Sequence, residues 1–119
     1  MDGFSNEFLP LKKILDGTSL RHQVIVNNLA NSNTPNFRRS DVKFSEYIQK
    51  AMDAQDRKGI EELRPEVVPG EGNIQANGNN VDLDTEVSLL SRNALMYRTF
   101  LHLLSMKINL LRTAITRNR

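Results

Sequence analysis

The most regular feature of the chain is an apolar stripe that runs through its last third. Between Leu83 and Ile115, apolar side chains recur at alternating steps of four and three residues, which is the spacing of a heptad seam. The stripe consists of Leu83, Val87, Leu90, Ala94, Tyr97, Leu101, Leu104, Ile108, Leu111 and Ile115. A second apolar edge runs beside it through Met96, Phe100, Leu103, Leu110 and Ala114. The pattern predicts one long helix over residues 82–119, with an apolar face too wide for a single partner helix and therefore suited to assembly.

A second heptad pattern occupies the N-terminal part of the chain. Its positions are Phe4, Phe8, Leu11, Leu15, Thr18, His22, Ile25 and Leu29. We expect a continuous helix from about Pro10, because proline is tolerated in a first helical turn, to Ala30. Residues 31–37 should end this helix, since Asn and Ser side chains compete for backbone hydrogen bonds and Pro35 disfavours the helical conformation at Thr34. Residues 1–38 thus form an N-terminal helix with an Asn-rich stop.

The middle of the chain predicts two less regular segments. Residues 39–59 favour a short amphipathic helix, capped near Ser40 or Asp41, whose apolar positions are Phe44, Ile48, Ala51 and Met52. Residues 60–81 contain several Pro and Gly residues without helical periodicity, which predicts an extended loop with a short strand near Val67 and Val68 or near Ile74.

These segments together predict an all-α fold in one structural domain. The two long terminal helices should form an antiparallel, coiled-coil-like pair, with the short third helix bracing the part that the pair leaves uncovered. At 1.5 Å per residue the first helix spans roughly 30 Å and the last roughly 50 Å, so neither covers the other completely.

Charge is distributed unevenly along the chain. Residues 41–86 carry five basic and eleven acidic side chains, whereas residues 87–119 carry six basic side chains and no acidic one. The cations could complement the negative end of the helix dipole. Alternatively, the basic helix could dock against the acidic middle segments of neighbouring copies. The cations are spread between apolar residues without stacking aromatic side chains, so nucleic acid is not an expected partner.

Catalytic and metal-binding chemistry is not predicted. The chain has no cysteine, and its two histidines, His22 and His102, lie far apart without an obvious carboxylate partner. A calcium loop starting at Asn80 would place Thr85 where glycine is required, so the nearby carboxylates are expected to cap the last helix. No run of apolar residues is long enough to cross a membrane, and the first residues lack the pattern of a cleaved signal peptide. We expect no enzyme, cofactor or bound metal.

Two Asn-containing segments resemble signatures of a known family. Residues 27–31 (NNLAN), followed by residues 33–37 (NTPNF), are similar to the N-terminal signature of the flagellar rod, hook and axial proteins. That family usually has glycine before the aromatic residue; Asn36 occupies the position here and also tolerates a left-handed conformation. Residues 79–86 (NNVDLDTE), leading into the last helix, are similar to the second signature of the proximal rod members.

The resemblance assigns structural roles to two groups of residues. In the first signature they are Asn28, Asn31, Asn33, Thr34, Pro35 and Phe37. In the second they are Asn80, Val81, Asp82, Asp84 and Glu86.

What the resemblance implies is a structural subunit of the bacterial flagellar basal body, in the proximal rod that crosses the periplasm and transmits torque. Its partners would be other copies of itself, other proximal rod proteins, the adaptor between rod and membrane ring, and the flagellar export gate. Such subunits are exported unfolded by the type III apparatus, without a cleaved signal peptide. The alternative is a small helical-hairpin subunit or effector of another secretion system, although such proteins usually join their helices by a short turn.

Overall fold

The chain folds into an elongated, mainly helical body measuring 67 × 25 × 16 Å. The computed structural model describes residues 2–53 and 57–117, with the side chains of the first helix from Phe8 onward. Its elements are α1 (Asp2–Ala30), β1 (Ser40–Val42), α2 (Phe44–Asp53), α3 (Arg57–Glu62), β2 (Val67–Pro69) and α4 (Leu83–Arg117). Within the described residues, no helix combines the length and the apolar character that a membrane crossing needs.

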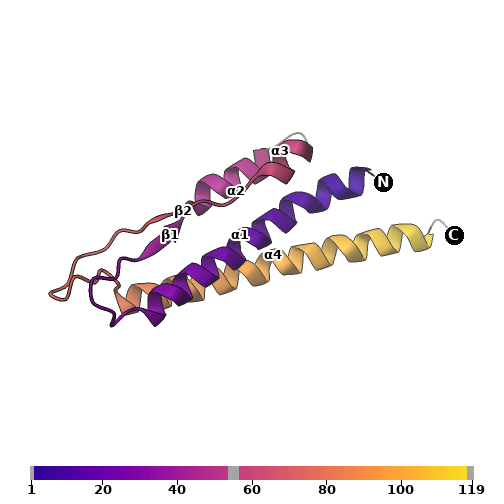
Figure 1. Cartoon of the computed structure of the whole chain (residues 1–119). Coiled ribbons are helices and arrows are strands. Elements are labelled where there is room, and N and C mark those ends of the chain that lie inside the picture. Colours follow the sequence, from indigo (N-terminus) through magenta and orange to yellow (C-terminus); the bar gives the residue numbers. More distant parts are fainter. Residues whose placement is uncertain (1, 54–56, 118–119) are drawn as a thin grey trace.

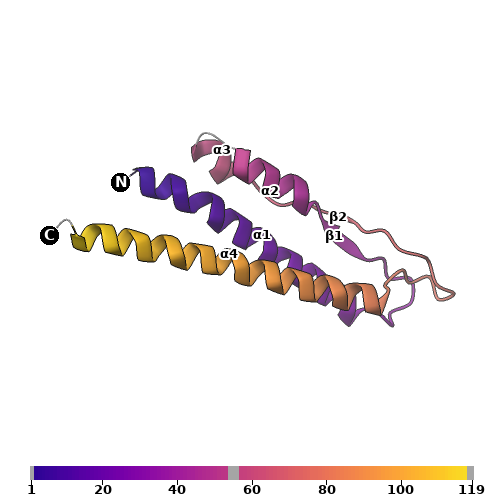
Figure 2. The same cartoon turned by 180° about the vertical axis from the view of Figure 1, so that it is seen from behind.

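Helix α1 lies at the centre of the molecule. It contacts α4 on one side and α2, β1 and α3 on the other, as both views of the ribbon show (Figures 1 and 2). The described ends of α1 and α4 near the two termini lie at the same end of the body, and the loops that precede α4 lie at the other (Figure 1). The short helix was expected to brace the part that the pair of long helices leaves uncovered, but α2 packs against α1, on the side away from α4.

A close approach between α1 and α2 explains this packing. Tyr47 is buried, and its hydroxyl donates to the carbonyl of Lys13 at 2.7 Å. A Cβ added at Gly17 would lie 2.5 Å from the Tyr47 ring, so the ring can rest on α1 only because residue 17 is glycine. On the same side, the Lys13 ammonium donates to the carbonyls of Glu61 and Leu63, which holds the end of α3.

The fold is not purely helical, because a two-stranded antiparallel sheet joins β1 to β2. Ser40 pairs with Pro69, Asp41 with Val68, and Val42 with Val67. The strand expected near Val67 is therefore present, whereas the helix expected to begin near Ser40 or Asp41 begins at Phe44. A third helix, α3, spans the end of the segment predicted as the short helix and the start of the predicted loop. Helix α1 also begins earlier than expected, at Asp2, and Pro10 lies inside it.

The buried face of α1 differs from its predicted stripe. Thr18 and Ile25 are buried as members of that stripe, but His22 is exposed, and Ile14 and Asn28 are buried in its place. Phe4 belongs to the predicted stripe but lies outside the described side chains. The difference arises because α1 is covered on two sides, so a single seam does not describe its buried surface.

The face of α4 that meets α1 also lies beside the predicted stripe. Its two buried side chains are polar, Glu86 and Asn93, and they are seven residues apart. Seven of the ten stripe residues are exposed: Leu83, Val87, Ala94, Tyr97, Leu101, Ile108 and Ile115. The other three, Leu90, Leu104 and Leu111, are half-buried. Helix α4 therefore leaves most of its apolar stripe without a partner in its own chain.

Candidate functional site

The two Asn-containing segments meet at the loop end of the molecule, where α1 ends and α4 begins. Five buried polar residues join them: Asn28, Arg39, Asn79, Asn80 and Glu86. We call this cluster the polar junction. Because buried polar groups are costly unless hydrogen-bonded, their partners determine what the junction does.

Asn79 ties the residues that precede α4 to the turn that follows α1. Its amide nitrogen donates to the carbonyls of Asn31 at 2.9 Å and Thr34 at 2.8 Å. Its side-chain oxygen accepts from the backbone N–H of Val81 at 2.6 Å. Both carbonyls also accept a backbone N–H within the turn, from Thr34 and Phe37 respectively, so Asn79 ties the residues before α4 to a turn that is already formed.

The neighbouring turn depends on two residues with left-handed backbone conformations. Asn36 has a φ of 63°, which confirms that it takes the conformation usually supplied by glycine at this position, and Gly78 has a φ of 83°. The backbone N–H of Asn36 donates to the carbonyl of Asn77 at 2.9 Å. A Cβ at Gly78 would collide with the side chain of Asn36, so the two loops can cross here only with glycine at position 78.

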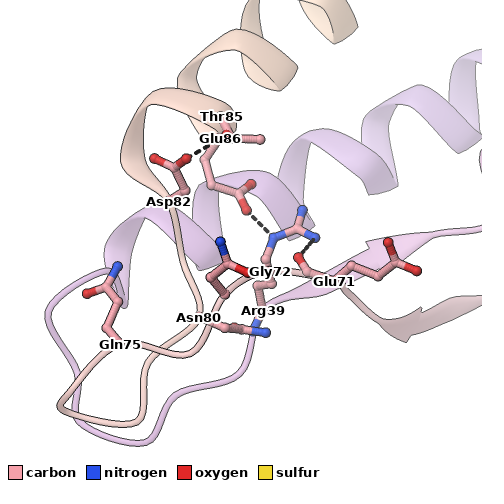
Figure 3. Close-up of a pocket in the computed structure, with 9 residues that line it drawn as sticks. Arg39, Glu71, Gly72, Gln75, Asn80, Asp82, Thr85 and Glu86 are labelled. Atoms are coloured by element: carbon pink, nitrogen blue, oxygen red, sulfur yellow. Dashed lines mark hydrogen bonds and ion pairs between the residues drawn. The ribbon is translucent and has the colours of Figure 1, made fainter.

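Arg39 connects the first segment to α4 by charge. Its Nε donates to Glu86 (Figure 3). Its terminal nitrogens donate to both carboxylate oxygens of Asp41 at 2.9 and 2.8 Å. One terminal nitrogen also donates to the carbonyl of Glu71 at 2.9 Å. Burial alone would lower the pKa of Arg39, but the hydrogen bonds to Asp41 and Glu86 raise it above its usual value. The guanidinium is therefore a permanent cation neutralised inside the fold.

Asn28 fixes strand β1 to α1. Its amide nitrogen donates to the carbonyl of Ser40 at 2.9 Å, and its side-chain oxygen accepts from the N–H of Ser40 at 3.0 Å. This pair of bonds occupies both backbone groups of Ser40 in the way a neighbouring strand would. The same amide nitrogen reaches the Glu86 carboxylate at 3.3 Å, so Asn28 links α1, β1 and α4.

Helix α4 is capped by Asp82. One carboxylate oxygen accepts from the N–H of Asp84 at 3.2 Å and the other from the hydroxyl of Thr85 at 2.8 Å. Asp84 is exposed in the first helical turn, where its charge favours the helix dipole. Val81, just before the cap, is buried.

The remaining residues of the two signatures contribute less to the junction. The Thr34 hydroxyl donates to the Asn31 side chain at 3.2 Å, and the carbonyl of Phe37 accepts from the N–H of Asn80 at 3.3 Å. The side chains of Asn33 and Pro35 are exposed.

Sequence reasoning missed Arg39 and Asn79 as site residues. Arg39 follows another arginine, Arg38, which is exposed, so no local pattern distinguishes the buried member of the pair. Asn79 lies in a run of polar residues and acquires its role only through contacts with residues more than forty positions away. Thr18 and Asn93 contribute a further buried polar contact, in which the Asn93 amide donates to the Thr18 carbonyl at 2.8 Å.

A depression beside the junction does not offer reactive groups. Its wall includes Arg39, Gln75, Asn80, Asp82 and Glu86 (Figure 3). Every guanidinium nitrogen of Arg39 is already bonded within the chain, and Asp82 is engaged as a cap. Among the described residues, no group of His, Cys, Asp and Glu side chains could hold a metal ion. The chemistry of the junction is that of a structural joint between α1, β1 and α4.

Comparisons with known proteins identify the family. No protein-family profile matches the chain. The flagellar basal body rod protein FlgB of Bacillus subtilis is 30% identical over 98% of both chains. The FlgB of Aquifex aeolicus is 31% identical over 87% of this chain and 88% of its own, and that of Borreliella burgdorferi is 34% identical over 71% and 77%.

These relatives define the class of the molecule as a structural component of the flagellar basal body rod. More narrowly, the chain belongs to the FlgB family of flagellar basal body rod proteins. The relatives do not favour the alternative of a subunit from another secretion system.

Proposed function

We propose that this protein is a structural subunit of the proximal rod, which assembles helically through its terminal helices and transmits torque without catalysing a reaction. In this proposal, α1 and α4 form an antiparallel, coiled-coil-like unit. The order of their contacts supports it. Asn28, near the end of α1, contacts Glu86, near the start of α4. Thr18, earlier in α1, contacts Asn93, later in α4, so the two helices run in opposite directions. The polar junction then fixes the relative position of the two helices.

The observation that carries the proposal is the uncovered apolar stripe of α4. Leu83, Val87, Leu101, Ile108 and Ile115 each expose between 40% and 58% of their surface. Apolar surface of this extent on a soluble protein marks a contact with another chain, because burying it is favourable by about 25 cal/mol per Å². Other copies of this chain and other rod proteins are the partners we propose for the stripe.

The proposal includes the route and the neighbours of the subunit. The rod would cross the periplasm, with the subunit close to the adaptor of the membrane ring and to the export gate. Export through the flagellar type III apparatus without cleavage is part of the same proposal, and N-terminal sequencing of protein recovered from basal bodies would test it.

Substitutions on the stripe test the assembly role directly. The double variant Leu101→Asp/Ile108→Asp places charge on the stripe, and we expect it to abolish motility when it replaces the rod protein in a host strain. Leu95→Asp is the matched control, because Leu95 is 67% exposed on the same helix but lies off the stripe. Electron microscopy of purified basal bodies should show rods with the control and none with the double variant. Normal rods with both would contradict the proposal.

A further inference from the structure

A groove lies between α1 and α4 about halfway along the pair. Thr18 and Asn93 line its buried part, and His22, Ala94, Tyr97 and Arg98 surround it. Its volume is about 280 Å³, and its wall is mainly apolar. Four of these residues, Thr18, His22, Ala94 and Tyr97, belong to the predicted heptad stripes of the two helices, so both stripes border the same groove.

The buried part of this groove contains an unsatisfied hydrogen-bond acceptor. Asn93 is 2% exposed, and its amide nitrogen donates to the carbonyl of Thr18. Its side-chain oxygen has no partner, and it is the single buried side-chain atom in that condition among the described residues. Leaving such a group unpaired costs about 1–3 kcal/mol, so a donor that reaches it from the groove would be stabilising.

The charge at the edge of the groove favours an occupant that carries a carboxylate. Arg98 lies at its rim and makes no ion pair among the described residues, and His22 lies on the opposite helix. An occupant therefore needs apolar side chains for the wall, a neutral donor for Asn93 and a carboxylate near Arg98.

The first turns of α4 provide these three properties on one surface. Leu83 and Val87 are 55% and 49% exposed. Ser88 and Ser91 are exposed neutral donors, and the Asp84 carboxylate is exposed and accepts no hydrogen bond within the described chain. The chain thus carries both a groove and a segment of complementary chemistry, at different positions along its length.

We propose that the groove at Asn93, here called the Asn93 groove, receives residues 83–91 of a second copy of this chain. In this contact Val87 packs beside Ala94 and Tyr97, a serine hydroxyl donates to Asn93, and Asp84 pairs with Arg98. In this proposal the contact is heterologous, with each copy giving its segment to one neighbour and its groove to another, so one groove and one segment stay free at the ends of any row of copies. The inference rests on the proposed rod function and defines which surfaces meet.

Cysteine cross-linking tests the geometry, since the chain has no cysteine of its own. A Val87→Cys copy and an Ala94→Cys copy would be expressed together in a strain that lacks its own rod protein, and basal bodies would be purified and oxidised. We expect a disulfide-linked dimer from the mixture, because a disulfide forms only between residues whose Cα atoms lie within about 7 Å. Val87→Cys alone should give no dimer. Leu95→Cys replaces Ala94→Cys as the matched control and should also give none.

The outcomes separate this inference from the proposed function. Copies that are incorporated into basal bodies but are linked only as Val87→Cys homodimers, or equally well through Leu95→Cys, would overturn the heterologous contact and leave the rod function intact. Failure of wild-type copies to enter basal bodies would contradict the proposed function itself.

Charge exchange provides an independent test in the same strain. Arg98→Glu gives a copy whose groove and segment are both acidic, and Asp84→Lys gives one in which both are basic. Each variant alone should weaken incorporation by roughly fivefold, the upper range for a partly exposed ion pair. Expressed together, they should restore it, because each groove then meets a segment of opposite charge. Equal incorporation of single and paired variants would overturn the inference.

Asn93→Leu distinguishes recognition from folding. It removes the unpaired buried oxygen and also the bond from the Asn93 amide to the Thr18 carbonyl. These two effects on stability have opposite signs, so thermal unfolding of the monomer should change little, while incorporation into basal bodies falls. Incorporation equal to that of the wild type by a variant whose monomer unfolds at the same temperature would show that Asn93 has no role in recognition.

Discussion

The side-chain amide of Asn28 and the carboxylate of Glu86 lie 3.3 Å apart, although 58 residues separate them in the chain. Glu86 is fully buried and shares its other oxygen with Arg39. One carboxylate therefore holds the end of α1, the strand that follows it and the start of α4. Any displacement of α4 along α1 would leave a buried charge without a partner.

The first prediction concerns this carboxylate. Glu86→Gln retains the size of the side chain but removes the charge opposite Arg39, and we expect the free energy of unfolding to fall by about 3 kcal/mol, as when one partner of a buried ion pair is removed. Urea unfolding followed by circular dichroism measures the change. Glu62→Gln, on an exposed glutamate of α3, is the control and should be nearly neutral. Equal midpoints for both variants would show that the buried pair does not contribute.

The second prediction concerns the left-handed residue at the turn after α1. Asn36→Gly should preserve or slightly increase stability, because glycine adopts a φ of 63° without strain. Asn36→Val should lower the free energy of unfolding by about 1–2 kcal/mol, because a β-branched side chain is poorly accommodated there. The two variants are compared in the same unfolding experiment, and a valine variant as stable as the glycine variant would disprove the assigned conformation.

The third prediction follows from the buried tyrosine between α1 and α2. Burial, reinforced by the charge of Asp16, raises the pKa of Tyr47 above that of an unfolded tyrosine, which is about 10. Its contribution to stability is therefore complete below about pH 10 and is lost as the pH rises through the higher folded-state value.

Tyr47→Phe isolates this contribution. At neutral pH the variant should be about 1 kcal/mol less stable, since it lacks the hydrogen bond to the carbonyl of Lys13. The difference from the wild type should shrink as the pH rises further, since only the wild type can ionise at this position. Denaturant unfolding at a series of alkaline pH values provides the measurement, and a difference that grows with pH would contradict the assignment.

The fourth prediction concerns the order of the free monomer. The C-terminal part of α4 exposes apolar residues such as Leu101, Ile108 and Ile115, and isolated helical segments with little tertiary packing are marginal in water. We expect rapid amide hydrogen exchange over residues 101–115 in dilute monomer and strong protection in assembled rods. The polar junction provides an internal reference, since amides near Glu86 should be protected in both states. Strong protection of residues 101–115 in the monomer would disprove the prediction.

The pattern of apolar residues predicted the long helices well but not which face each one buries. Heptad spacing identifies residues that can form a seam, and α4 indeed runs through all ten positions of its stripe. The face turned toward α1 is instead selected by Glu86 and Asn93, two polar residues that a hydrophobic pattern assigns to solvent. Their burial depends on partners in α1 and β1, so it could not be read from α4 alone.

The candidate site was predictable where it depends on local backbone chemistry. Asp82 as a helix cap and Asn36 as a left-handed residue follow from short-range preferences, and the structure confirms both. The strand at residues 40–42 was predicted as helix because its stabilisation comes from Asn28 and from β2, which lie far away in sequence. Long-range partners of this kind explain why Arg39 was missed as well.

The glycine at position 17 makes α1 an unusual target for protein engineering. Replacing a mid-helix glycine with alanine is a standard route to a more stable protein, worth about 1 kcal/mol in helix propensity. Here the added methyl group would occupy the place of the Tyr47 ring and force α2 away from α1. A variant chosen for helix propensity alone, such as Gly17→Ala, would therefore separate α2 from α1 and destabilise the fold.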